Sequence, residues 1–161
     1  MLNFFGKSPK HVDQQFSDLS TMLCHDRENP TYKRELLDPE KLDFSIDSLK
    51  HLDAYLDALH AAPPQGDDFV RVVLRCGAYV GEVIRKNSPN ELHWVTFKEA
   101  AKSSTYAKGL GFSVATAGIL WRNPGNMCFP LAKVCKFIEN GREDSVYTFA
   151  RVILEDRDVQ L

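Results

Sequence analysis

The sequence has little net charge and no long hydrophobic run, and these two absences exclude several classes of protein. Its 161 residues carry a formal net charge of −2, which argues against a general nucleic-acid binder, because such proteins carry an excess of basic residues. The most apolar stretch, Phe69–Ile84, is interrupted by Arg71, Arg75 and Glu82, so no uncharged run approaches the ~18 residues of a membrane span. Met1–Lys10 lacks the apolar centre of a secretion signal, and we therefore expect a cytoplasmic protein.

Motifs for metal binding, redox chemistry and catalysis are also missing. No CxxC pair occurs among the four cysteines, Cys24, Cys76, Cys128 and Cys135, so we expect buried, reduced thiols. Gly109-Leu110-Gly111 lacks the third glycine of a dinucleotide loop and the Gly-Lys-Ser/Thr of a phosphate loop, and there is no Gly-x-Ser-x-Gly elbow. The sequence therefore indicates no catalytic residue, no cofactor and no metal site, and it favours a non-enzymatic protein.

The sequence does contain enough apolar residues, 43% of the chain, to form the core of one domain. Apolar residues at helical spacing predict helices over 9–24, from an N-cap at Ser45 to Pro63, and over 68–87, 130–140 and 143–156. Alternating patterns predict strands over 92–97 and 112–121, followed by a turn over 123–126. We therefore predict an α+β fold with one mostly helical domain over 1–161. It would have an N-terminal helix and loop over 1–41 and a core over 42–156. A small two- to three-stranded antiparallel sheet would lie between the central and C-terminal helices.

The predicted central helix contains Gly77 and Gly81, which lie four residues apart and share one helix face. Two glycines weaken a helix by roughly 1 kcal/mol each relative to alanine. We therefore expect another element to approach this face closely and to compensate by packing.

The same helix carries two charged residues among apolar neighbours, Arg75 and Glu82. A buried charge is costly unless it is paired, and two hypotheses follow. Glu82 could be a functional carboxylate in a pocket lined by Tyr79, Arg75 and Trp94. Alternatively, it could form a buried ion pair or hydrogen bond that fixes the helix against its neighbours.

The small net charge conceals an acidic segment and a basic segment. Nine acidic and two basic residues lie within 35–68, and eight basic and two acidic residues lie within 85–136. We predict Asp47, Asp53 and Asp57 as an acidic partner face, because such a face speeds encounter with a basic protein. The alternatives are a solvated helix surface, or contact between the acidic and basic segments within the fold.

These charged segments also allow two other functions. Asp53, Asp57 and His60 have a spacing that could hold a metal, but no Cys/His cluster completes such a site. Aromatic residues are interleaved with the basic segment, as in some nucleic-acid surfaces. The acidic half would oppose a phosphate backbone, so a nucleic acid is not the expected partner. A membrane is not expected either, because the sequence lacks an uncharged run long enough to span one.

Three stretches, 44–57, 75–87 and 129–149, carry a resemblance to a widespread group of small, uncharacterised bacterial domains. The matching residues form a Gly-x-Tyr-x-Gly-Glu helix, a tryptophan strand and a late Asn-Gly-x-Glu-Asp-Ser junction: Gly77, Tyr79, Gly81, Glu82, Trp94, Asn140, Gly141, Glu143, Asp144 and Ser145. Some of these domains resemble immunity proteins that neutralise secreted bacterial toxins. The resemblance thus implies structural motifs and a protein partner, a cognate toxin. The predicted function is a protein-binding module of this kind, and the alternative is a ligand-binding or enzymatic domain that uses Glu82.

Overall fold

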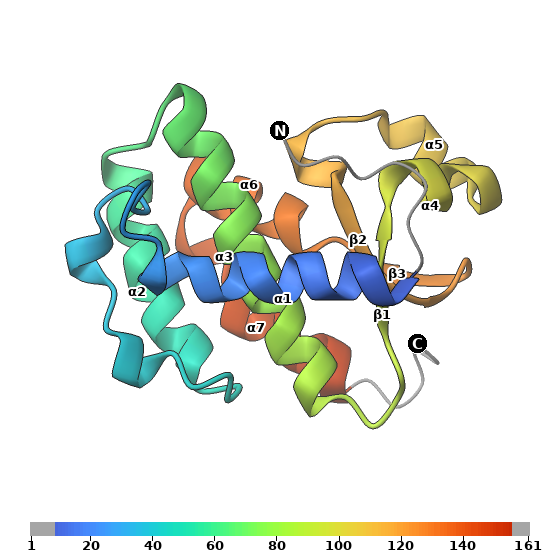
Figure 1. Ribbon diagram of the computed structural model, residues 1–161, viewed down its shortest axis with the longest axis horizontal. Helices are drawn as coiled ribbons and strands as arrows, with labels where there is room; N and C mark the ends of the chain where they lie inside the picture. Colours follow the sequence, from blue (N-terminus) through green and yellow to red (C-terminus); the bar gives the residue numbers. More distant parts are fainter. Residues whose placement is uncertain (1–8, 156–161) are drawn as a thin grey trace.

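The computed structural model (Figure 1) describes residues 9–155 and confirms the predicted α+β class. Its helices are α1 (Pro9–His25), α2 (Ser48–Ala61), α3 (Gly66–Asn87), α4 (Phe97–Ser103), α5 (Thr105–Leu110), α6 (Pro130–Asn140) and α7 (Val146–Glu155). Its strands are β1 (His93–Thr96), β2 (Gly118–Asn123) and β3 (Asn126–Cys128). Most of the segment in which no secretion signal is expected, and residue 156 at the predicted helix end, lie outside the described residues.

Helix α3 is the centre of the packing, as its apolar sequence predicts. In Figure 1, α1 crosses in front of α3, while α6 and α7 lie behind it. Twelve α3 residues between Val72 and Ile84 are buried. The ends of the helix suit its dipole, with Asp67 and Asp68 in the first turn and Arg85 and Lys86 in the last. Apolar side chains of α1, such as Phe16, belong to the same core as those of α3.

The two glycines of α3 allow close approach of neighbouring elements, as predicted. A Cβ atom at Gly77 would lie 2.8 Å from the Cα of Leu131, at the start of α6. At Gly81 it would overlap the six-membered ring of Trp94 in β1. Packing therefore replaces the helix propensity that the glycines lack.

The three strands form one antiparallel sheet in the order β1-β2-β3, so β1 is an edge strand. The prediction of a strand over 112–121 is wrong in its first half, because residues 114–116 form a 3₁₀ turn. There the Thr116 hydroxyl accepts a hydrogen bond from the Ser113 N–H and donates to the Gly111 carbonyl. These local bonds compete with strand pairing, so β2 begins only at Gly118.

Helix boundaries differ from the prediction where short turns precede a helix. Helix α2 begins at Ser48, and Ser45 accepts a hydrogen bond from the Ser48 N–H in the turn before it. Helix α7 begins at Val146, because Gly141, with φ of 87°, leads into a 3₁₀ turn over 142–144. Helix α5 was not predicted; Ser104 caps it by accepting from the Ala107 N–H.

The close contact at Gly81 predicts a stability effect. Gly81→Ala should lower the free energy of unfolding by about 1–3 kcal/mol, because the added methyl group must displace the Trp94 ring. Gly109→Ala is the control, since a Cβ atom there meets nothing within 4 Å. Urea unfolding measures both variants. Equal stability of the two alanine variants would contradict the packing argument.

Candidate functional site

Glu82 lies in the interior, where α1, α3 and β1 meet, and is 1% exposed. Its Oε1 atom accepts a hydrogen bond from the Trp94 indole at 2.8 Å and another from Arg85 Nε at 2.9 Å. Arg85 also forms an ion pair with Asp13 of α1, at 3.1 Å. These donors compensate the carboxylate for its loss of water.

Asp13 extends this network from α1 to β1. Its carboxylate accepts a hydrogen bond from the Trp94 N–H at 2.6 Å and lies 2.8 Å from Nδ1 of His93. Trp94 is therefore bound at its indole by Glu82 and at its backbone by Asp13. The network fixes β1 against two helices.

Tyr79 and Arg75, the other predicted pocket residues, make separate contacts. The Tyr79 hydroxyl donates to Ser48 Oγ at 2.7 Å and accepts from the Phe44 N–H at 3.0 Å, and burial raises the pKa of Tyr79. Arg75 donates to Asp26 at 2.5 Å. The structure therefore brings Glu82 and Trp94 together but holds Tyr79 and Arg75 in different hydrogen-bond networks.

The electrostatics of the Arg75 contact are those of a paired charge. Burial lowers the pKa of the guanidinium below its ordinary value. The pKa of Asp26 is also lowered, first by the Asn29 N–H, which donates to its carboxylate, and further by Arg75. Arg75 also donates to the Asn29 carbonyl and to the Thr31 hydroxyl. These bonds join α3 to the loop that follows α1.

The polar side of α2 holds the junction between α6 and α7. Asp53 accepts from the Val146 N–H at 2.8 Å and from the Ser145 hydroxyl at 2.5 Å, so it caps the start of α7. Burial raises the pKa of Asp53. One turn further along α2, Asp57 accepts from Arg142 Nε at 3.0 Å. His60 Nδ1 lies 2.9 Å from the Ile138 carbonyl. The side of α2 that carries Asp53, Asp57 and His60 is therefore a contact within the fold and not a solvated helix surface.

The predicted acidic partner face is therefore reduced in the structure. Asp47 projects into solvent and pairs with Lys50 at 2.8 Å, whereas Asp53 and Asp57 are engaged with the α6–α7 junction. Within the part of the chain that the structure describes, no three His, Cys, Asp or Glu side chains are placed to hold a metal ion. Over the same residues, no helix is both long enough and apolar enough to cross a membrane.

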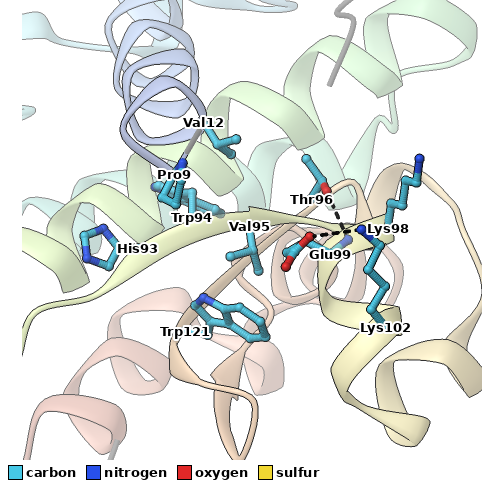
Figure 2. A pocket seen from close by; sticks show the side chains of 10 residues that line it. All are labelled: Pro9, Val12, His93, Trp94, Val95, Thr96, Lys98, Glu99, Lys102 and Trp121. Atoms are coloured by element: carbon cyan, nitrogen blue, oxygen red, sulfur yellow. Dashed lines mark hydrogen bonds and ion pairs between the residues drawn. The ribbon is translucent and has the colours of Figure 1, made fainter. Parts of the chain in front are cut away.

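Two hollows were not predicted, because each is lined by segments that are distant in the sequence. One, of about 330 Å³, lies at the open edge of β1 (Figure 2). The other, of about 710 Å³, is named here the apolar groove and lies between α1, the first half of α3 and residues 112–117. The apolar groove is lined by Leu19, Met22, Asp67, Val70, Arg71, Leu74, Arg75, Phe112, Val114 and Ala117.

The apolar groove exposes large hydrophobic side chains. Met22 is 38% exposed, Val70 41% and Phe112 73%. The only signal for it in the sequence was that α3 is apolar nearly all round, which leaves Val70 on the surface. Nothing in the sequence indicated that Phe112 is exposed, because the strand expected over 112–121 would have placed this residue in the sheet.

Comparisons of the chain with protein-family models, with curated proteins and with solved structures find no match. The resemblance to small bacterial domains therefore stays a prediction. The geometry nevertheless gives many of its motif residues a structural role. Gly77 and Gly81 permit close packing, Tyr79 and Glu82 bond to neighbouring elements, and Ser145 binds Asp53.

A structural role for Glu82 predicts that Glu82→Gln lowers the free energy of unfolding by about 1–2 kcal/mol. The amide keeps an oxygen for the Trp94 indole but removes the charge that pairs with Arg85. Glu99→Gln is the control, because Glu99 pairs with Lys102 on the surface, at 3.6 Å, and should lose less than about 0.5 kcal/mol. Chemical denaturation measures both. Unchanged stability in Glu82→Gln would favour a functional carboxylate instead.

The cap formed by Asp53 predicts that Asp53→Ala costs about 1–2 kcal/mol of stability. Asp47→Ala should cost less than about 0.5 kcal/mol, since Asp47 makes no side-chain cap hydrogen bond and its ion pair is exposed. Thermal and urea unfolding at pH 7 measure the difference. Similar losses in the two variants would argue against the capping role.

The raised pKa of Asp53 also predicts a pH dependence. The folded state binds a proton on Asp53 more tightly than the unfolded state does, so this contribution to stability is complete below the ordinary pKa of 3.8. It is lost as the pH rises through the raised value. Asp53→Asn, which cannot ionise, should therefore gain stability relative to the parent protein over this interval. A constant difference between the two stability curves would contradict the assignment.

Proposed function

We propose that the protein is a non-enzymatic protein-binding module whose partner docks in the apolar groove. The observation that carries the proposal is the exposure of Met22, Val70 and Phe112 around one concave surface. Exposed apolar side chains that gather in this way mark interaction sites in soluble proteins. The groove combines side chains of three separate elements, so a partner bound there would contact α1, α3 and residues 112–117 together.

The charges around the groove define the chemistry of this partner. Arg71 pairs with Asp68 at 3.0 Å, and Arg75 pairs with Asp26 at 2.5 Å. Asp67 is exposed and makes no ion pair with any residue between 9 and 155. The unneutralised charge at the rim is therefore negative. We infer a partner segment with an apolar anchor and a neighbouring basic side chain.

The acidic segment supports such a partner at longer range. Asp43 and Asp47 are exposed on this part of the chain, Asp47 beside Lys50, and a net negative charge in this segment would speed the encounter with a basic protein. In this proposal the acidic segment steers the partner, while the apolar groove supplies most of the binding free energy. Asp53 and Asp57 stay in their structural role.

The resemblance described above suggests a secreted bacterial toxin as the partner, and thus an immunity protein that acts in the cytoplasm. The cysteines agree with a reducing compartment. All four are free thiols, and burial raises the pKa of Cys128 to about 12 and that of Cys135 to about 11. Cys135 is half-buried, whereas the other three are buried.

The alternative function, a ligand-binding or enzymatic site built on Glu82, has less support. Two donors of the fold, Trp94 and Arg85, already bind the Glu82 carboxylate. A substrate would have to replace one of them. The apolar groove is exposed without any such rearrangement.

Site-specific photo-cross-linking in cells tests the proposal. A photoreactive phenylalanine at position 112 should cross-link the partner, and the same residue at Glu40, an exposed position in the turn over 39–41, should not. The captured protein is then purified and its Kd for this chain is measured. Cross-linking of the same protein with equal yield from both positions would contradict docking in the apolar groove.

Two matched variants then test the groove itself. Val70→Asp should weaken binding of the purified partner at least tenfold, because it places a charge among the apolar contacts. Val152→Asp, which changes an even more exposed valine on α7, should leave Kd within about twofold. Asp67→Lys should also weaken binding if the partner is basic. An unchanged Kd in Val70→Asp would refute this docking site.

A further inference from the structure

The end of α5 carries a cluster of exposed apolar side chains. Tyr106 is 65% exposed and Leu110 is 47% exposed, and their spacing of four residues places both on one face of the helix. Phe112, in the turn after α5, is exposed as well. Three of the large hydrophobic side chains that are exposed within residues 9–155 therefore lie close together in the chain, and such a gathering marks an interaction surface.

The opposite side of α5 attaches the helix to the rest of the fold. Ala107 is buried and belongs to the same small core as Ile119 of β2. The Tyr106 ring meets the Phe129 ring edge to face, with ring centroids 5.9 Å apart. Because Ala107 occupies the inner face of α5, Tyr106 and Leu110 stay on its outer face.

The charged side chains of α4 and α5 are mostly positive. Lys98, Lys102 and Lys108 are exposed on these helices, and Glu99 is the only acidic residue between positions 92 and 138. Glu99 pairs with Lys102 at 3.6 Å, so the two helices keep a positive excess beside the exposed apolar side chains. In Figure 1, α2 with its carboxylates lies toward the other end of the molecule.

Exposed apolar side chains among lysines fit the surface of an anionic membrane. Lysine is attracted to negatively charged phospholipid headgroups, and tyrosine and leucine bury their apolar parts at the boundary between headgroups and acyl chains. A single-stranded nucleic acid fits less well, because arginine and aromatic side chains stack on its bases. Residues 97–113 contain no arginine, and the aliphatic Leu110 does not stack on a base. Contact with a membrane surface needs no membrane-spanning helix.

We propose that Lys102, Tyr106, Lys108 and Leu110, named here the α5 tip, bind the surface of membranes that contain anionic phospholipids. Tyr106 and Leu110 insert at the boundary between headgroups and acyl chains, and the two lysines lie among the phosphate groups. A contact with two apolar side chains is reversible, unlike the insertion of a transmembrane helix. No residue of the α5 tip lines the apolar groove, so this proposal and the proposed function fail separately.

Sedimentation of the full chain with lipid vesicles tests the proposal. The protein should bind vesicles of phosphatidylserine and phosphatidylcholine, mixed in roughly equal amounts, at least tenfold more strongly than vesicles of phosphatidylcholine alone. Added salt should weaken this binding. Absence of binding to the mixed vesicles, or equal binding to both kinds, would refute the proposal. Binding of a single-stranded oligothymidylate in place of the mixed vesicles would assign the α5 tip to a nucleic acid instead.

A pair of full-length variants tests the apolar part of the contact. Tyr106→Ser combined with Leu110→Ser should lower the vesicle partition coefficient at least tenfold, because both inserted side chains are lost. Leu36→Ser combined with Val152→Ser is the matched control, since it removes two exposed apolar side chains elsewhere on the molecule. The control should bind the mixed vesicles within about twofold of the parent protein. Equal losses in the two variants would argue against the α5 tip as the contact.

A charge variant and a groove variant complete the test. Lys102→Gln combined with Lys108→Gln keeps the apolar side chains and should also lower the vesicle partition coefficient at least tenfold. This variant decides the matter if the double-serine variant at Tyr106 and Leu110 does not fold. Val70→Asp, which changes the apolar groove, should leave vesicle binding unchanged. Loss of vesicle binding in Val70→Asp, or unchanged binding in the double-glutamine variant, would refute the proposal.

Discussion

The packing of the Trp94 indole against α3 is the contact on which the rest of the fold depends. The ring lies over Gly81, donates its N–H to Glu82, and stacks on Phe16 of α1 with ring centroids 4.1 Å apart. One side chain thus joins a strand to two helices. The carboxylate must be buried to reach the indole, and a buried carboxylate needs further donors. Arg85 meets this need and also reaches Asp13, so the hydrogen bonds and the aromatic packing position β1 together.

A second set of contacts joins the C-terminal helices to α2. Gly141 has a positive φ of 87° and lies close to the His60 ring. A Cβ atom added at Gly141 would lie 3.2 Å from that ring. Asp144 accepts hydrogen bonds from Lys133 and Asn140 beside it, which lower its pKa, first through Lys133. The Gly-x-Tyr-x-Gly-Glu pattern of α3 and the Asn-Gly-x-Glu-Asp-Ser pattern before α7 look most like functional motifs in the sequence. In the structure, both are places where helices or strands are joined to one another.

The sequence predicts what depends on local periodicity. The apolar pattern of α3 and the need for close approach at Gly77 and Gly81 follow from spacing alone, and both are confirmed. Contacts between distant positions are not encoded in spacing. Asp53 binds Val146, 93 residues away, and so a residue predicted on a partner face proves to be a helix cap. The apolar groove escapes sequence analysis for the same reason, because its concave surface exists only when three separate segments meet.

The net charge of the chain is close to zero, but its charged side chains are distributed unevenly over the fold. The ion pairs of the acidic segment lead to Lys50, Arg71 and Arg142. In the basic segment, Arg85 forms an ion pair with Asp13, and Lys133 forms one with Asp144. In Figure 1, α2 lies toward one end of the long axis, and α4 and α5 lie toward the other. The carboxylates of α2 and the lysines of α4 and α5 thus lie toward opposite ends of the molecule, whereas Lys133 and Lys136 of the basic segment lie on α6, which packs against α2. A charge distribution of this kind orients an approaching partner before contact, and its effect on the association rate falls with added salt. Binding in the apolar groove itself depends on burial and responds less to salt, so the salt dependence of association and dissociation rates separates steering from docking.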